Sequence, residues 1–305
     1  MNNEFINNLI EQEIKFSDEL AKKYNYPDNI THLLYLIIPA FIIKYKTTNR
    51  LIIENCFQTV PIFISGKQDK IYQAYYMSTP KYVNGEIETS KKVVLNNYDN
   101  IALIQLIDNL VHEYNHAVNS IQNEVNIKDM VTVRTGISHN YFNKNNLKFI
   151  RKSDEIILEE VINTKQTESI IDIIKSFNDY EIRNTIVANT LYSINYSITS
   201  NYKSESYYVE SLVCKKLMEN RTFISTFETL RFEGQIDDLH DFFDNITGKK
   251  GSLMDLSKLL NKTLELQKEL PNVRFFKKSK IEKIRSLTRE ALEIVETFNN
   301  NTTFK

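Results

Sequence analysis

Apolar residues recur at helical spacing over most of the chain. Positions three and four residues apart share one face of an α-helix, so this spacing predicts helices that bury one side in a core. The breaks between them include Gly234, Gly248, Gly251 and Pro271, residue types that commonly interrupt helices. The segments predicted to be helical are residues 4–24, 30–46, 99–122, 154–177, 180–198, 204–220, 236–245, 252–270 and 278–299.

Four shorter segments have the composition of β-strands. Residues 50–57, 70–78 and 91–97 are rich in β-branched and aromatic residues, and they precede the helix predicted over 99–122. Residues 131–142 alternate apolar and polar positions, which predicts a hairpin inserted between two helices. A small sheet ahead of one helix, followed by a mainly helical chain, predicts a single α+β domain.

The helix predicted over residues 99–122 has one polar and one apolar face. His112 and His116 lie one turn apart on the polar face, and Glu113 follows the first of them. Together they form the pattern H-E-x-x-H, which on a helix is typical of a catalytic zinc site. The opposite face is apolar enough to bury the helix in a core; it carries Leu103, Leu106, Ile107, Leu110, Val111, Tyr114, Ala117, Val118 and Ile121.

This spacing suits zinc because residues four apart point the same way. The two imidazoles can therefore meet one Zn²⁺ at about 2.0–2.1 Å. Glu113 lies about 100° round the helix, next to the metal rather than on it. It is placed to take a proton from a zinc-bound water, whose pKa the metal lowers to near 7, and to pass that proton to a leaving nitrogen. A catalytic zinc normally has three protein ligands, so one more is expected.

Six downstream side chains qualify as the third ligand: His139, Asp154, Glu155, Glu159, Glu160 and Glu168. Glu160 is preferred because it lies on a stripe of apolar and small polar residues, where a carboxylate is costly to bury unless it is paired or binds a cation. Glu159 lies nearer polar neighbours, a setting closer to water. The alternative is that both are ordinary acids on a helix surface.

At these residues the chain resembles the zincin metallopeptidases, and among them the gluzincins, whose third zinc ligand is a glutamate on a later helix. The stretch LEEVINT, residues 158–164, is similar to that glutamate helix. Glu160 matches the ligand, and Asn163 or Thr164 matches the position that supports a zinc histidine. The separation between His116 and Glu160 is longer than in the thermolysin-like members. The resemblance covers about residues 91–177.

The resemblance implies Zn²⁺ as the cofactor, a peptide or protein as the substrate, and hydrolysis of peptide bonds. It also implies a zincin-like fold, with an upper lobe over about residues 1–125 and a mainly helical lower lobe over about 126–305. In such a fold the edge strand of the upper sheet pairs with an extended peptide. An oxyanion-stabilising donor is expected as well, and Arg134, His139, Tyr141 and Tyr180 are candidates that no spacing separates.

Net charge, cysteine content and the length of apolar runs indicate the kind of partner and the compartment to expect. The 305 residues carry a net charge of −1, which argues against electrostatic nucleic-acid binding as the main activity. Cys56 and Cys214 belong to no metal or redox motif and are expected to be buried thiols in a reducing compartment. The longest apolar run, residues 33–43, is too short to cross a bilayer, and the N-terminus lacks the features of a secretory signal. We therefore expect a cytoplasmic protein without a membrane partner.

Two other interpretations fit the same motif. One is a zinc-binding interaction or structural protein without catalytic activity, which a fourth protein ligand on the metal would favour. The other is a helical adaptor in which the H-E-x-x-H pattern is accidental, which predicts no bound metal.

Overall fold

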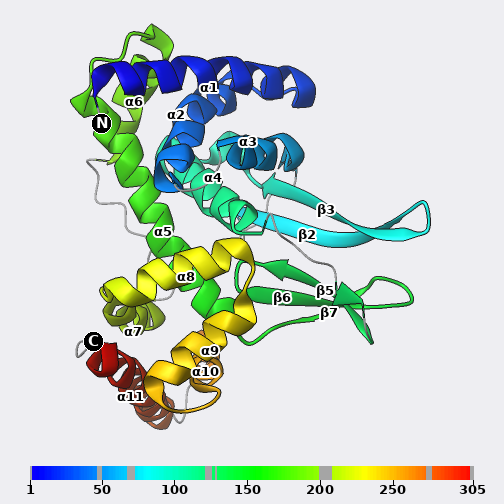
Figure 1. Cartoon of the computed structure of the whole chain (residues 1–305), viewed down its shortest axis with the longest axis vertical. Helices are drawn as coiled ribbons and strands as arrows, with labels where there is room; N and C mark the ends of the chain where they lie inside the picture. Colours follow the sequence, from blue (N-terminus) through cyan, green and yellow to red (C-terminus); the bar gives the residue numbers. More distant parts are fainter. Residues whose placement is uncertain are drawn as a thin grey trace. The chain divides into compact units, whose positions relative to one another are not determined.

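The computed structural model describes residues 2–46, 50–66, 73–120, 126–127, 129–198, 208–272 and 277–302. Within them the chain is α+β, mostly helical with two small sheets (Figure 1). The chain divides into two compact units. Unit 1 comprises Met1–Thr79, Ser90–Val118 and Thr164–Ser204, and unit 2 comprises Pro80–Thr89, Asn119–Asn163 and Glu205–Lys305. Residues 164–204 thus belong to unit 1 although they follow a segment of unit 2 in the chain.

In unit 1, several helices pack around α2. The sequence of α2 is apolar on every side, so it is buried by neighbours all round rather than on one face. The elements that lie wholly or partly in this unit are α1 (Asn3–Tyr24), α2 (Asp28–Lys44), α3 (Arg50–Thr59), β1 (Ile62–Ile64), β2 (Ala74–Val83), β3 (Glu86–Leu95), η1 (Tyr98–Asn100), α4 (Leu103–Val118), α5 (Ile156–Ser176), η2 (Phe177–Asp179) and α6 (Thr185–Ile198).

The three-stranded sheet has β3 in the middle and β2 at one edge. β1 runs parallel to β3, with Ile62 opposite Val93 and Ile64 opposite Leu95. Val93, Val94 and Leu95 are all buried, so both faces of β3 are covered at this end. An edge strand such as β2 presents backbone groups to which another extended segment can pair.

Unit 2 combines a four-stranded antiparallel sheet with five further helices in the described residues. The sheet has the order β4-β5-β6-β7, and the turn between β5 and β6 contains Gly136 at a φ of +58°. The first turns of α5 share a core with the later helices. The elements are β4 (Asn126–Ile127), β5 (Met130–Thr135), β6 (Ser138–Asn143), β7 (Phe149–Lys152), α7 (Tyr208–Met218), α8 (Arg221–Glu233), α9 (Ile236–Thr247), α10 (Ser252–Glu269), η3 (Leu270–Asn272) and α11 (Lys277–Thr302).

The helical pattern predicted most of the helices, and the hairpin over residues 131–142 is confirmed as β5 and β6. The expected thiols are also confirmed as buried and free, at Cys56 and Cys214. Parts of three predicted segments, residues 70–72, 121–122 and 204–207, lie outside the described residues.

Two predictions were wrong, for different reasons. Residues 50–57 form α3 rather than a strand. Ile53, Cys56 and Phe57 are buried there at spacings of three and four, which is a helical face, whereas Leu51 is 66% exposed. α8 was absent from the prediction although its sequence signals are present. The Asn220 side chain accepts a hydrogen bond from the Phe223 N–H (3.0 Å), and Gly234 ends the helix in the left-handed conformation.

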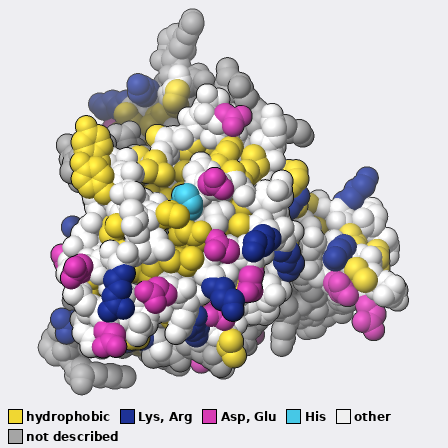
Figure 2. All heavy atoms as spheres, turned by 90° about the horizontal axis from the view of Figure 1, so that it is seen from above, with side chains coloured by type: hydrophobic (Ala, Val, Ile, Leu, Met, Phe, Trp, Pro, Cys, Tyr) yellow, Lys and Arg dark blue, Asp and Glu magenta, His cyan; other side chains and the backbone are white. Residues whose placement is uncertain are grey.

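The surface carries mixed charge. On the face seen in Figure 2, Lys and Arg side chains are interspersed with Asp and Glu side chains around exposed apolar groups. Among the described residues, no helix combines the length and apolar character needed to cross a membrane.

Candidate metal centre

The helix that carries the motif, α4, is anchored in unit 1 by its apolar face. Tyr114 stacks on Phe57 with ring centroids 4.1 Å apart, and its hydroxyl donates a hydrogen bond to the Val60 carbonyl oxygen (3.0 Å). Both rings are fully buried. Because the stack fixes one side of α4, the histidines on the other side have a defined direction.

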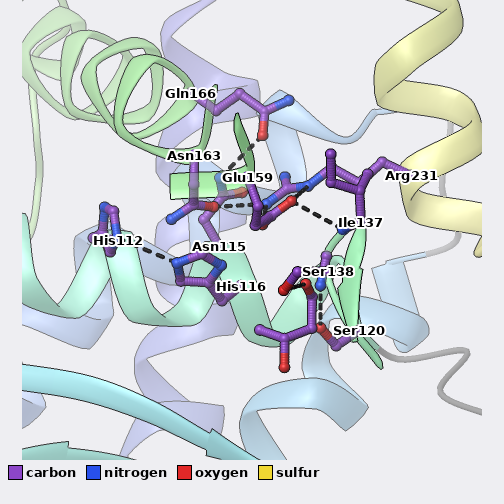
Figure 3. Close-up of polar contacts among 12 residues, drawn as sticks. His112, Asn115, His116, Ser120, Ile137, Ser138, Glu159, Asn163, Gln166 and Arg231 are labelled. Carbon is purple, nitrogen blue, oxygen red and sulfur yellow. Dashed lines mark hydrogen bonds and ion pairs between the residues drawn. The ribbon is translucent and has the colours of Figure 1, made fainter. Parts of the chain in front are cut away.

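The two motif histidines lie side by side, as Figure 3 shows. Their Nε2 atoms are 3.2 Å apart, and the rings meet edge to face with centroids 4.9 Å apart. Ligands at about 2.0–2.1 Å on a tetrahedral zinc are separated by about 3.3 Å, close to this distance. A hydrogen bond between one protonated and one unprotonated Nε2 has a similar length. Measuring the metal content of the protein distinguishes a shared metal from such a hydrogen bond. His116 is 3% exposed and His112 is half-buried.

Glu160, on α5, is the carboxylate that joins the histidines. Potential ligand atoms of His112, His116 and Glu160 all lie within 4.8 Å of one another. No other group of three or more His, Cys, Asp or Glu side chains in the described part of the chain meets this distance. The structure therefore brings together the three residues that the sequence singled out as ligands.

Glu113 has a backbone partner. Its Oε2 accepts a hydrogen bond from the N–H of Tyr76 on β2 (2.5 Å), and its side chain is 9% exposed. Tyr76 lies on the edge strand of the three-stranded sheet. One hydrogen bond thus connects the expected general base with the strand to which an extended peptide could pair.

Asn115 links α4 to α5 and to Tyr45, the residue that follows α2. Its Nδ2 donates to Gln166 Oε1 on α5 (3.1 Å), and its Oδ1 accepts from the hydroxyl of Tyr45 (2.5 Å). Gln166 and Glu160 lie on the same uninterrupted helix. Asn115 is fully buried, so these two hydrogen bonds satisfy an amide that would otherwise be costly to enclose.

Glu159 has a setting opposite to the one expected. It is fully buried rather than close to water, and it forms an ion pair with Arg231 of α8. Its Oε2 accepts hydrogen bonds from Arg231 Nε (3.0 Å) and from the Ile137 N–H (2.9 Å). Glu160 is the more exposed of the two. The burial argument for preferring Glu160 was therefore wrong, even though Glu160 is the residue that lies with the histidines.

The remaining ligand candidates lie elsewhere. His139, Asp154 and Glu155 line a pocket of about 420 Å³ in unit 2, and Glu168 pairs with Lys165 on the surface. In this pocket His240 Nε2 lies 3.3 Å from Glu155 Oε1, and this hydrogen bond raises the pKa of His240. Burial lowers the pKa of His139. None of these four candidates belongs to the group that includes the motif histidines.

Arg134, one of the oxyanion candidates, is buried among backbone carbonyls. Its Nη1 donates to the carbonyl oxygens of Gly136 (2.7 Å) and Arg231 (2.8 Å). Tyr141 lies beneath the Arg151 guanidinium, 4.4 Å from ring centroid to Cζ. These contacts give both residues structural roles within unit 2.

Sequence reasoning missed three partners of the site: Tyr76, Gln166 and Arg231. Tyr76 makes its contact through the backbone N–H, and such a contact cannot be predicted from the residue type. Gln166 is one of several polar residues of its helix that no spacing separates, and Arg231 lies in the helix that the pattern did not predict. The caps of α8 at Asn220 and Gly234 were the signal that could have located Arg231 on a helix.

No protein-family model matches this chain, and neither a curated protein nor a solved structure matches it.

Proposed function

We propose that this chain is a zinc-dependent peptidase with a zincin-like fold, in which His112, His116 and Glu160 hold Zn²⁺ and Glu113 is the general base. The observation that carries the proposal is the convergence of two imidazoles and one carboxylate, with all potential ligand atoms within 4.8 Å. The three residues come from two helices that are far apart in sequence, so helical spacing alone does not produce the cluster.

The donor set fits zinc. Imidazole nitrogen and carboxylate oxygen are both common zinc ligands, and two histidines with one glutamate leave the fourth tetrahedral position open. The separation of 3.2 Å between the histidine nitrogens is close to the tetrahedral value of about 3.3 Å. The remaining distances, up to 4.8 Å, are within reach of a side-chain rotation of Glu160.

When bound, zinc would act as a Lewis acid and lower the pKa of a water molecule at the site to near 7. Glu113 would accept a proton at a carboxylate oxygen and later release it to the leaving nitrogen. The Tyr76 N–H holds Oε2 of Glu113 and so restricts rotation of its carboxylate. Because Tyr76 belongs to an edge strand, a peptide paired along β2 would lie beside the base.

Replacement of Glu113 by Gln tests the proposal. The amide keeps the size of the side chain but cannot accept a proton at neutral pH, so metal should stay while turnover falls. We expect hydrolysis of a mixed peptide library to drop by at least about 10²-fold, with zinc per chain and thermal midpoint unchanged. His32→Ala is the matched control, because His32 lies outside the cluster and packs beside Tyr35.

The outcomes separate the three interpretations. Equal cleavage rates for wild type and Glu113→Gln would remove Glu113 from the mechanism. A zinc-loaded wild type that cleaves nothing would favour the interaction or structural protein, and a chain that takes up no zinc would favour the accidental motif.

A further inference from the structure

The largest fully buried side chain among the described residues is a cation, Arg231. Its Nε donates to Glu159 Oε2 (3.0 Å), and its Nη2 donates to Glu159 Oε1 and to Asn163 Oδ1 (2.8 Å). Both acceptors lie on α5, one turn apart. The guanidinium therefore holds the first half of α5 against α8 with two-point geometry that Lys could not reproduce.

The turn between β5 and β6 also contacts the Glu159 carboxylate and fixes its position. The Ile137 N–H donates to Glu159 Oε2 (2.9 Å), and Gly136 precedes it at a φ of +58°. A Cβ at Gly136 would lie 2.0 to 2.2 Å from the carboxylate atoms of Glu159, so only glycine leaves room for this carboxylate. The Gly136 N–H itself donates a hydrogen bond to Ser120 Oγ (3.0 Å).

Stability alone does not account for this arrangement. Removing two charges from water costs several kcal/mol per ion, and a well-packed apolar pair is commonly as stable as a buried ion pair or more so. An apolar pair does not fix the rotation of a helix about its axis. A forked, bidentate ion pair fixes the rotation of the helix that carries it, whereas apolar side chains tolerate small rotations.

Rotation of α5 matters because Glu160 is the next residue. Side chains of consecutive helical residues project about 100° apart, so the direction of Glu159 sets the direction of Glu160. With Glu159 held against α8 and the β5–β6 turn, Glu160 projects to another side of α5, where it lies with the motif histidines. We propose that Arg231 and Glu159 are positioning residues that aim the Glu160 carboxylate at the metal. This inference depends on the proposed zinc site.

The test is the zinc affinity of a double variant, Arg231→Met with Glu159→Met. Methionine keeps approximate volume and leaves no unpaired buried charge, so we expect a folded protein. Loss of a residue that orients a metal ligand typically weakens metal binding by 10-fold to 100-fold. We expect a shift of that size in zinc titrations against a competing chelator, together with a changed visible absorption of the Co²⁺-loaded protein.

The matched control replaces an ion pair of unit 2 that is exposed. Lys216 Nζ lies 2.7 Å from Glu296 Oε1 on the surface, and Lys216→Met with Glu296→Met should leave zinc affinity unchanged. If the buried double variant does not fold, the zinc affinity of the single variant Arg231→Lys tests the positioning role instead. It keeps the charge but not the fork, and we expect zinc binding between wild type and the 10-fold loss.

The outcomes distinguish this inference from the proposed function. A wild type that binds zinc, beside a folded double variant or Arg231→Lys with the same affinity and Co²⁺ spectrum, would overturn the positioning role alone. A wild type that binds no zinc would overturn the proposed site and this inference with it.

Discussion

The helix that carries the two histidines and the start of the helix that carries Glu160 are held in place in different ways. α4 is fixed by a buried apolar face, with Tyr114 stacked on Phe57, and by hydrogen bonds between uncharged groups such as the Asn115 amide and the Gln166 amide. The start of α5 is fixed by a buried ion pair, a backbone N–H and a glycine turn. Packing tolerates exchange of apolar residues of similar size, whereas a buried charge needs its own partner. Mutations on the α4 side and on the α5 side of the site should therefore differ in their effects on zinc binding and on stability.

The largest expected effect is on the α4 side. His116→Ala removes one of two adjacent imidazoles, and a site left with one histidine and one carboxylate should lose zinc below detection. Because α4 is held by its apolar face, the thermal midpoint of the metal-free protein should change little. The measurement is elemental zinc per chain, with His32→Ala as control. Retention of one zinc per chain in His116→Ala would place the metal elsewhere.

On the α5 side, replacing either of two neighbouring glutamates should affect stability differently. Glu160→Ala should weaken zinc binding severely while the metal-free protein keeps its stability. Glu159→Ala leaves Arg231 buried without its carboxylate, which typically costs about 3–5 kcal/mol of unfolding free energy. Urea unfolding of the metal-free proteins and chelator titration of the folded ones measure both quantities. If Glu159→Ala were as stable as wild type, the buried ion pair would not hold α5.

This contrast also explains how much of the site the sequence revealed. His112, Glu113 and His116 lie within one and a half turns of a helix, so their spacing alone specifies a shared face. Glu160 is preferred in the sequence by a burial argument and by likeness to a glutamate helix, and the burial argument failed because Arg231 pairs with Glu159 in the core. No periodicity of α5 contains that information, since the partner lies on α8.

The fold was predictable to a similar extent. Amphipathic helices and the β5–β6 hairpin follow from local patterns, but the sequence of α3 also fits a strand, because a short apolar run does not distinguish a helix from a strand. The division into units was beyond local patterns as well. Residues 164–204 belong with the N-terminal helices through contacts that the order of elements does not specify.

A buried carboxylate in unit 1 offers a comparison with Glu159. Glu13 on α1 is fully buried like Glu159, but its partner Arg50 is about one-third exposed and also pairs with Glu54. Burial raises the pKa of Glu13 from 4.5 to about 7; Arg50 opposes this rise and Glu54 adds to it. Glu13 thus shares one arginine with a second carboxylate, whereas Glu159 is paired with both Nε and Nη2 of Arg231.

The pH dependence of stability follows from this shift and gives the smallest of the expected effects. Between pH 4.5 and about 7 the folded protein holds a proton on Glu13 that the unfolded chain has released. Its stabilising contribution is therefore complete below pH 4.5 and is lost as the pH rises towards 7, with an expected size of about 1–3 kcal/mol. Glu13→Gln mimics the protonated form, so it should gain stability relative to wild type at pH 8 and not at pH 4.5. Urea unfolding of both proteins at these two pH values isolates Glu13, because all other titrating groups are common to them. A difference between the proteins that is the same at both pH values would show that Glu13 keeps its charge in the fold.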